Sequence, residues 1–210
     1  MSKFEEIAEA VIEGSVDEVA DLAQGLVDGG AEPGEIIKQG LVEGMDVVGA
    51  RFKKNEMFVP EVLISAKAMH AGMDIVKPLL ADEDESSAGT VIIGTVEGDL
   101  HDIGKNLVAM MLEGAGFEVV DLGVDIPADK FVEAVKEHQP EVVGMSALLT
   151  TTMPAMEETI AALEEAGIRD QVKIMVGGAP VTEEFSNEIG ADAYAPDGST
   201  STDLAREFVQ

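Results

Sequence analysis

The C-terminal part of the chain alternates short apolar stretches with stretches of helical spacing, and this alternation strongly limits its possible folds. In several of the short stretches, apolar residues follow one another without alternating with polar residues, which is typical of strands that are buried on both faces. The strand candidates are residues 90–96, 118–122, 141–148, 173–176 and 192–195. Helical stretches lie between and after them, near residues 102–115, 128–138, 153–166, 181–189 and 200–209. The pattern predicts an α/β domain with a doubly wound, five-stranded parallel sheet.

Residues 1–80 have a different sequence pattern. Apolar residues recur there at helical spacing in four runs, which are separated by turns that contain glycine or proline. Ser15 and Glu18 have the spacing of a capping box, so we expect them to close the start of the second helix. Short connections make neighbouring helices antiparallel. We therefore expect an all-α N-terminal domain that forms a four-helix bundle.

The segment between these two parts, residues 81–89, is acidic and contains no apolar residue larger than alanine. Such a composition is typical of an exposed linker. The chain is thus predicted to contain a helical domain at residues 1–80, an acidic linker at 81–89 and an α/β domain at 90–210.

Charge and composition exclude several classes of function. The formal net charge of −29 repels phosphate backbones, so we expect no nucleic-acid partner. No apolar run is long enough to span a bilayer and the N-terminus lacks a signal pattern, so we expect a cytoplasmic protein without a membrane partner. The chain has no cysteine, so a bound metal has His, Asp or Glu ligands or arrives inside a cofactor.

The motif at residues 98–104 follows the first predicted strand directly, at the edge where doubly wound sheets bind ligands. It places His101 between Asp99 and Asp102. A carboxylate behind an imidazole sets its tautomer and leaves the other ring nitrogen for a metal. The residues alone also allow a structural histidine, an Asp102 that caps the helix, and a Gly104 that permits close helix packing.

Two later landmarks stand at the ends of other predicted strands. After Gly104 come 41 residues and then Ser146 and Leu148, at the end of the third strand; after Leu148 come 28 residues and then Gly177 and Gly178, at the end of the fourth. Because the carboxyl ends of parallel strands meet at one edge, we expect the three landmarks to converge. Glycines there let a planar ligand approach the backbone, although a plain strand-to-helix turn also explains them.

The pattern Asp-x-His-x-x-Gly, then Ser-x-Leu, then Gly-Gly resembles the cobalamin-binding signature of methionine synthase and of the corrinoid proteins of methyltransferase systems. In that family a four-helix cap precedes a flavodoxin-like domain, so the resemblance covers effectively the whole chain. The stretch 57–60, Met-Phe-Val-Pro, also resembles the cap of that family. The resemblance implies that the chain binds cobalamin in the base-off/His-on form.

Residue by residue, the resemblance makes His101 the lower axial ligand of the cobalt in cobalamin, where it displaces the dimethylbenzimidazole base of the cofactor. Asp99 would hydrogen-bond the far nitrogen of His101, and Thr152 stands where methionine synthase has a serine in the same relay; these three are the candidate catalytic residues. Further expected cofactor-binding residues are Gly98, Asp102, Ile103, Gly104, Ser146, Leu148, Thr150, Gly177, Gly178, Tyr194, Ala195, Asp197 and Gly198, together with Phe52 and Val59 of the cap over the upper face of the corrin.

The resemblance implies a methyl-carrier subunit of a multi-component methyltransferase and not a complete enzyme. Such a carrier accepts a methyl group on cobalt(I) from a substrate:corrinoid methyltransferase of a methylamine, methanol or methoxylated-aromatic O-demethylase system. It delivers the methyl group to a second methyltransferase that uses tetrahydrofolate or a thiol, and a reductive activator restores oxidised cobalt. The alternatives are a cobalamin-binding subunit of a mutase and a cobalamin-dependent sensor domain, or, without a corrinoid, a flavodoxin-like signalling domain.

Overall fold

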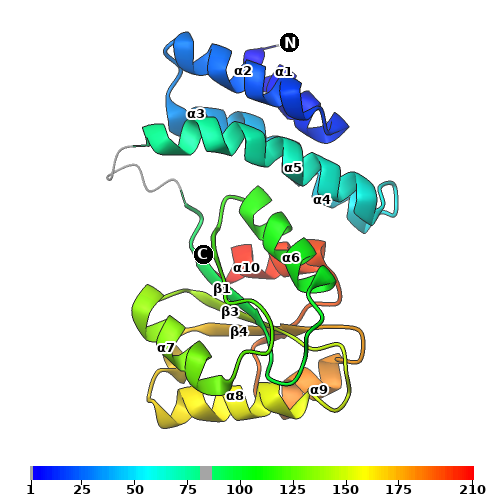
Figure 1. The fold of residues 1–210 in the computed structure, drawn as a ribbon, viewed down its shortest axis with the longest axis vertical. Helices are drawn as coiled ribbons and strands as arrows, with labels where there is room; N and C mark the ends of the chain where they lie inside the picture. The colour runs from blue at the N-terminus through cyan, green and yellow to red at the C-terminus, as the bar shows by residue number, and fades with distance from the viewer. Residues whose placement is uncertain (1, 81–86) are drawn as a thin grey trace. The chain divides into compact units, whose positions relative to one another are not determined.

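A computed structural model of the chain describes residues 2–80 and 87–210 and divides into two compact units (Figure 1). Unit 1 comprises Met1–Ser87 and Glu113–Gly116, and unit 2 comprises Ala88–Leu112 and Phe117–Gln210. Most of the expected linker, residues 81–86, lies outside the described residues. The boundaries 1–80, 81–89 and 90–210 therefore stay predictions.

Unit 1 is helical, as the spacing of its apolar residues predicts. The third expected helix is one continuous run with a π-helical stretch, η1 (Ile37–Val42), between two α-helical parts. The helices of this unit are α1 (Lys3–Glu13), α2 (Val16–Asp28), α3 (Pro33–Ile36), η1, α4 (Glu43–Lys53), α5 (Val59–Val76) and the short η2 (Lys77–Leu79). Fully buried apolar side chains form the core of the unit; they include Ile7, Val11, Val19, Leu41, Val48 and Val62.

The start of α2 differs from the sequence-based expectation. Ser15 has a ψ of 79°, outside the extended region of a capping residue, and its hydroxyl makes no capping hydrogen bond, so the predicted box of Ser15 and Glu18 is wrong. A capping box is present instead at α1. There the Glu5 backbone N–H donates to the Ser2 hydroxyl at 3.2 Å, and the Ser2 N–H donates to the Glu5 carboxylate at 2.7 Å.

Unit 2 is built on a five-stranded sheet in which every neighbouring pair is parallel, in the order β2-β1-β3-β4-β5. The strands are β1 (Thr90–Thr95), β2 (Glu118–Asp121), β3 (Val142–Ser146), β4 (Lys173–Gly177) and β5 (Ala193–Tyr194). The helices are α6 (Ile103–Gly114), α7 (Ala128–His138), α8 (Pro154–Glu165), the short η3 (Arg169–Gln171), α9 (Glu183–Glu188) and α10 (Gly198–Phe208). The predicted doubly wound sheet is confirmed.

Helices cover both faces of this sheet: α7, α8 and α9 lie on one face, and α6 and α10 on the other (Figure 1). On the first face, Phe131 of α7 and Ile160 of α8 belong to one buried apolar cluster with Ile92, Val143 and Ile174 of the three central strands. The burial of these side chains explains the continuous apolar runs of the strands.

The direction of the chain in β1 and β3 sets the position of the functional residues. Chain order reverses around β1, which pairs with β2 on one side and with β3 on the other, and ligands of doubly wound sheets bind beyond the carboxyl ends of the strands at this switch point. In register, Thr95, Ser146 and Gly177 stand side by side as the last residues of β1, β3 and β4.

Within residues 2–80 and 87–210, no helix combines the length and apolarity that crossing a bilayer requires.

Candidate functional site

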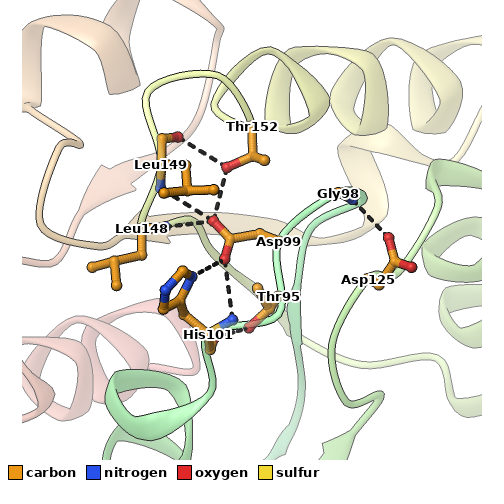
Figure 2. A network of polar contacts seen from close by, with 8 residues as sticks. All are labelled: Thr95, Gly98, Asp99, His101, Asp125, Leu148, Leu149 and Thr152. Atoms are coloured by element: carbon orange, nitrogen blue, oxygen red, sulfur yellow. Dashed lines mark hydrogen bonds and ion pairs between the residues drawn. The ribbon is translucent and has the colours of Figure 1, made fainter.

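The motif of residues 98–104 spans the loop that joins β1 to α6 and the start of α6, and hydrogen bonds hold this loop to the segments that follow β2 and β3 (Figure 2). Gly98 turns the chain with a φ of +80°, a conformation that side-chain-bearing residues rarely adopt. The buried Thr95 at the end of β1 donates its hydroxyl to the carbonyl of His101 at 2.9 Å. The position of His101 thus depends directly on the end of the strand.

Asp99 and His101 form the centre of the site. Nδ1 of the imidazole lies 2.7 Å from Oδ1 of Asp99, and the His101 backbone N–H donates to the same oxygen at 3.1 Å. The Asp99 side chain is fully buried, whereas the His101 side chain is half exposed. An ionised carboxylate only accepts hydrogen bonds, so Nδ1 carries the proton and Nε2 carries the lone pair.

The second oxygen of Asp99 binds to the loop after β3. Oδ2 accepts the backbone N–H of Leu148 at 2.7 Å and that of Leu149 at 3.2 Å, and it accepts the hydroxyl of Thr152 at 2.8 Å (Figure 2). Burial by itself raises the pKa of Asp99, but the hydrogen bonds from Leu148, His101 and Thr152 together hold that pKa well below its ordinary value. Asp99 is therefore an ionised carboxylate at neutral pH.

Thr152 is buried just before α8, and its hydroxyl has two acceptors. Oγ1 lies 2.8 Å from Oδ2 of Asp99 and 2.9 Å from the carbonyl oxygen of Leu149. A hydroxyl has a single proton, so it donates to one of these acceptors at a time. The arrangement brings Asp99, His101 and Thr152 together, as the resemblance implied; their chemical roles are proposed below.

Gly177 and Gly178 are explained by the sheet itself. A Cβ at Gly178 would lie 1.9 Å from the carbonyl oxygen of Ala147, and Gly178 has a φ of +126°. A Cβ at Gly177 would lie 2.7 Å from the carbonyl oxygen of Ala195. The close approach of the ends of β3, β4 and β5 thus requires glycine at both positions, and a ligand slot there stays a prediction.

At Gly104, by contrast, no neighbouring atom in the described residues requires a glycine. It is exposed on the first turn of α6, its φ lies outside the left-handed region, and a Cβ built on it would meet no atom within 4 Å. Within the described residues of unit 2, no helix lies close enough to Gly104 to require a glycine there. Open space beside His101 at this position fits a ligand that approaches the backbone closely.

Several large apolar side chains are exposed around His101. Leu100 and Ile103 are 71% and 79% exposed, and Leu148 and Leu149 across the site are 43% and 42% exposed. A half-exposed imidazole with a fixed tautomer, an open glycine and an apolar rim together fit a broad, flat macrocycle with a metal at its centre.

The remaining sequence-predicted residues lie at the same edge of the sheet or in unit 1. Asp102 is exposed and accepts the Asn106 side-chain amide at 3.2 Å. Asp197 caps α10 by accepting the Thr200 N–H at 2.8 Å. Ser146 ends β3, Thr150 is exposed in the loop after it, Tyr194 ends β5, Ala195 follows it and Gly198 begins α10. Phe52, near the end of α4, and Val59, which begins α5, both belong to unit 1.

Three polar residues near this edge were missed by the sequence analysis. Asp125 binds the loop at residues 98–99 from the side of β2, and buried Lys105 pairs with Asp121 at the end of β2. Asp121 ends the second strand and Asp125 follows it, at the same edge of the sheet as the motif. This position in the sequence could have marked both aspartates as candidates. Which partner each one meets depends on the pairing of β1 with β2.

Comparison with known proteins identifies the family. The B12 binding domain family matches residues 89–204, and a second B12 binding domain family matches residues 3–77. A corrinoid protein of Desulfitobacterium hafniense is 42% identical over 212 residues, which cover 100% of this chain and 98% of that protein. The chain belongs to the B12-binding corrinoid proteins.

Relatives of this corrinoid protein come from methyltransferase systems. The trimethylamine corrinoid protein 1 of Methanosarcina acetivorans is 51% identical over 76% of this chain and 74% of its own length. The crystal structure of the methanol:cobalamin methyltransferase complex MtaBC from Methanosarcina barkeri contains a chain that matches with a TM-score of 0.88 and 34% identity, over 97% of this chain and 78% of that one. The predicted family, its fold and its cofactor, cobalamin, are confirmed.

Proposed function

We propose that this corrinoid protein carries a methyl group between two methyltransferases, with cobalamin bound base-off and His101 as the lower axial ligand. When bound, the cobalt of cobalamin supplies the chemistry that accepts and donates the methyl group. The contribution of the chain is to hold the cofactor, fix the axial nitrogen and control access. The observation that carries the proposal is the 2.7 Å contact between Nδ1 of half-exposed His101 and buried Asp99.

His101 suits this role because its tautomer is determined by Asp99. The carboxylate keeps the proton on Nδ1, so the lone pair of Nε2 is free to bind a metal. Thr152 and the amides of Leu148 and Leu149 hold the carboxylate in place. Thr152 thus acts on the ligand through Asp99.

The apolar rim and the open glycine support a position for the macrocycle above His101. Leu100 and Ile103 offer apolar surface to its lower face, and Gly104 leaves room for its close approach. We propose that the displaced nucleotide tail passes along the ends of β3, β4 and β5. The residues on that path are Gly98, Asp102, Ser146, Leu148, Thr150, Gly177, Gly178, Tyr194, Ala195, Asp197 and Gly198.

The helical cap is proposed to shield the upper face of the cofactor through Phe52 and Val59. Val59 is 37% exposed, and its neighbours Phe58 and Leu63 are 64% and 37% exposed, so the start of α5 offers an apolar surface. The sequence analysis did not name Phe58 or Leu63 among the expected cofactor-binding residues. A surface of this kind suits a corrin face that bears a methyl group.

The proposed partners are a substrate:corrinoid methyltransferase, a second methyltransferase that uses tetrahydrofolate or a thiol, and a reductive activator. The relatives named for trimethylamine and the chain of the methanol:cobalamin complex support a methylamine or methanol donor system. The second B12 binding domain family matches the helical residues 3–77, and this helical part favours the carrier over a mutase subunit.

Electron paramagnetic resonance of the cob(II)alamin-loaded protein tests the axial ligand. A single nitrogen below cobalt splits the signal into triplets, and incorporation of histidine labelled with the heavy nitrogen isotope converts these to doublets if the nitrogen comes from the protein. We expect doublets in the labelled wild type and no nitrogen splitting in His101→Ala. Persistent triplets in the labelled protein mean that dimethylbenzimidazole is still bound, which would overturn His-on binding.

Methyl transfer tests the carrier role separately. The reduced, cobalamin-loaded protein is incubated with isotope-labelled methanol or trimethylamine and the methyltransferase of that system, and the label on the cofactor is measured by mass spectrometry. We expect label from one of these donors. Loaded protein that takes no label from either system would contradict a methanol or methylamine carrier.

A further inference from the structure

We propose that Asp125 is a positioning residue for His101, which holds the loop of Asp99 from the side opposite Thr152. The inference rests on the proposed ligation of cobalt by His101 and adds a residue that lies outside the motif. Asp125 follows β2, whereas Leu148 and Thr152, which bind the Asp99 carboxylate, lie in the loop after β3. The loop is therefore fixed from both neighbouring strands.

Asp125 makes two hydrogen bonds that flank Asp99 in the chain, and Figure 2 shows the one to Gly98. Its carboxylate oxygen Oδ1 accepts the backbone N–H of Gly98 at 2.7 Å, and its own backbone N–H donates to the carbonyl of Asp99 at 2.9 Å. One residue thus fixes the backbone on either side of the peptide bond that joins Gly98 to Asp99. The direction in which the Asp99 side chain leaves the backbone follows from these two bonds.

Asp125 itself is held against β1. The segment that contains it pairs with Thr95 on both sides, because the Thr95 N–H donates to the carbonyl of Gly123 at 3.0 Å and the Ile126 N–H donates to the carbonyl of Thr95 at 3.0 Å. The Thr95 hydroxyl donates in turn to the carbonyl of His101. Both the segment of Asp125 and the backbone of His101 are therefore hydrogen-bonded to Thr95 at the end of β1.

The backbone of Asp125 restricts which residues can serve here. Its φ is +56°, in the left-handed region that glycine, asparagine and aspartate tolerate and that alanine adopts only with strain. The carboxylate also supplies the acceptor for Gly98. Asparagine keeps both the backbone conformation and an acceptor, glycine keeps the conformation alone, and alanine keeps neither.

The residues after β3 and Asp125 hold different parts of Asp99. The Asp99 carboxylate is held in position by the amides of Leu148 and Leu149 and by the hydroxyl of Thr152. Asp125 instead holds the backbone from which the Asp99 side chain extends. His101 follows two residues later and meets the same carboxylate through both its ring and its N–H. Loss of the Asp125 carboxylate therefore loosens the imidazole without removing any group that contacts it.

The test compares Asp125→Asn, Asp125→Gly and Asp125→Ala with the wild type and with His101→Ala. In the protein without cofactor, hydrogen exchange of the Gly98 amide is followed by nuclear magnetic resonance. In the cob(II)alamin-loaded protein, the fraction of signal with nitrogen splitting is followed by electron paramagnetic resonance. Far-ultraviolet circular dichroism of each variant checks that the fold is retained.

We expect Asp125→Gly to speed exchange of the Gly98 amide about three- to tenfold and to lower the ratio of His-on to His-off cofactor by a similar factor, which is the value of one typical hydrogen bond at an exposed position. Asp125→Ala should show at least the same loss, and Asp125→Asn should restore most of both readouts. If Asp125→Ala fails to fold, the glycine and asparagine variants still decide the question.

Wild-type values of both readouts in Asp125→Gly would overturn the inference. So would an Asp125→Asn variant that is as impaired as the glycine variant, because the acceptor would then not matter. If His101→Ala itself leaves the nitrogen splitting unchanged, the proposed ligation fails, while exchange of the Gly98 amide in the protein without cofactor still reports on Asp125.

Discussion

Lys105 and Asp121 form an ion pair that joins the first turn of α6 to the end of β2. The Lys105 side chain is 1% exposed, whereas the Asp121 side chain is 41% exposed. The ammonium group also donates to the side-chain carbonyl of Asn106 at 2.7 Å. The pair anchors α6 to the end of β2, the strand that Asp125 follows.

The unequal burial of this pair predicts unequal costs for its two partners. Asp121→Ala leaves a buried ammonium group without its counter-charge and should lower the free energy of unfolding by about 3 kcal/mol. Lys105→Met leaves a carboxylate that water reaches and that still accepts the Gly123 N–H, so it should cost only about 1 kcal/mol. Urea unfolding of both variants measures the difference, and a larger loss in Lys105→Met would contradict it.

Asp99→Asn should destabilise the protein without cofactor by about 2–4 kcal/mol, because one of the amide atoms becomes a donor that faces other donors in a buried place. The depressed pKa of Asp99 sets the sign of the pH dependence. A carboxyl whose pKa is lower in the folded than in the unfolded state stabilises the fold fully above its ordinary pKa and loses that effect as the pH falls.

The difference in unfolding free energy between wild type and Asp99→Asn should therefore be largest near neutral pH and shrink below about pH 4. Urea unfolding at a series of pH values from about 7 down to about 2 measures it. A difference that stays constant with pH would mean that Asp99 is not the ionised anchor described above.

Much of the fold and the centre of the site follow from the sequence. The apolar runs predict all five strands, and the expected helix at 128–138 coincides with α7 (Ala128–His138). The motif brings Asp99 and His101 together because they lie two residues apart on one turn. Thr152 joins them because β1 and β3 are neighbours in the sheet, which the order of parallel strands makes foreseeable.

The features that escaped prediction depend on conformation or on distant contacts. Ser15 has the spacing of a cap but not the backbone conformation, and Ser2 has both. The π-helical stretch contains Gly40, where a Cβ would lie 2.4 Å from Ile7 in α1, so it depends on packing between separate helices. Asp125 depends likewise on the pairing of its segment with Thr95.

Asp192 offers a carboxylate of similar chemistry away from the proposed cofactor. It accepts the Ile174 N–H and the Arg169 guanidinium at 2.8 Å each and Lys173 at 3.2 Å; burial raises its pKa, but these three bonds outweigh burial and lower it. Asp192→Asn should cost about 1–2 kcal/mol of unfolding free energy, with a loss that shrinks at low pH. Cobalamin titration should give an unchanged dissociation constant, and a weakened one would contradict this separation.

Thr152→Ser and Thr152→Val test the hydroxyl in the relay. Serine keeps the donor to Asp99, so the loaded protein should keep its wild-type ratio of His-on to His-off cofactor. Valine removes the donor from a buried carboxylate and should cost about 1–2 kcal/mol of unfolding free energy and lower that ratio severalfold. Visible absorption of the loaded protein measures the ratio. Equal ratios in the serine and valine variants would show that the hydroxyl has no influence on His101.

Gly104 and Gly178 predict opposite behaviour for the same substitution. Gly178→Ala forces a methyl group into the carbonyl of Ala147 at a left-handed position, so the protein without cofactor should lose several kcal/mol of stability. Gly104→Ala places a methyl group in open space on a helix and should leave that protein as stable or up to about 1 kcal/mol more stable. Cobalamin binding by Gly104→Ala should nevertheless weaken about tenfold or more, because the methyl group stands where the cofactor approaches. Thermal unfolding without cofactor and cobalamin titration separate the two effects, and a Gly104→Ala variant that binds cobalamin as tightly as the wild type would contradict the position proposed for the macrocycle.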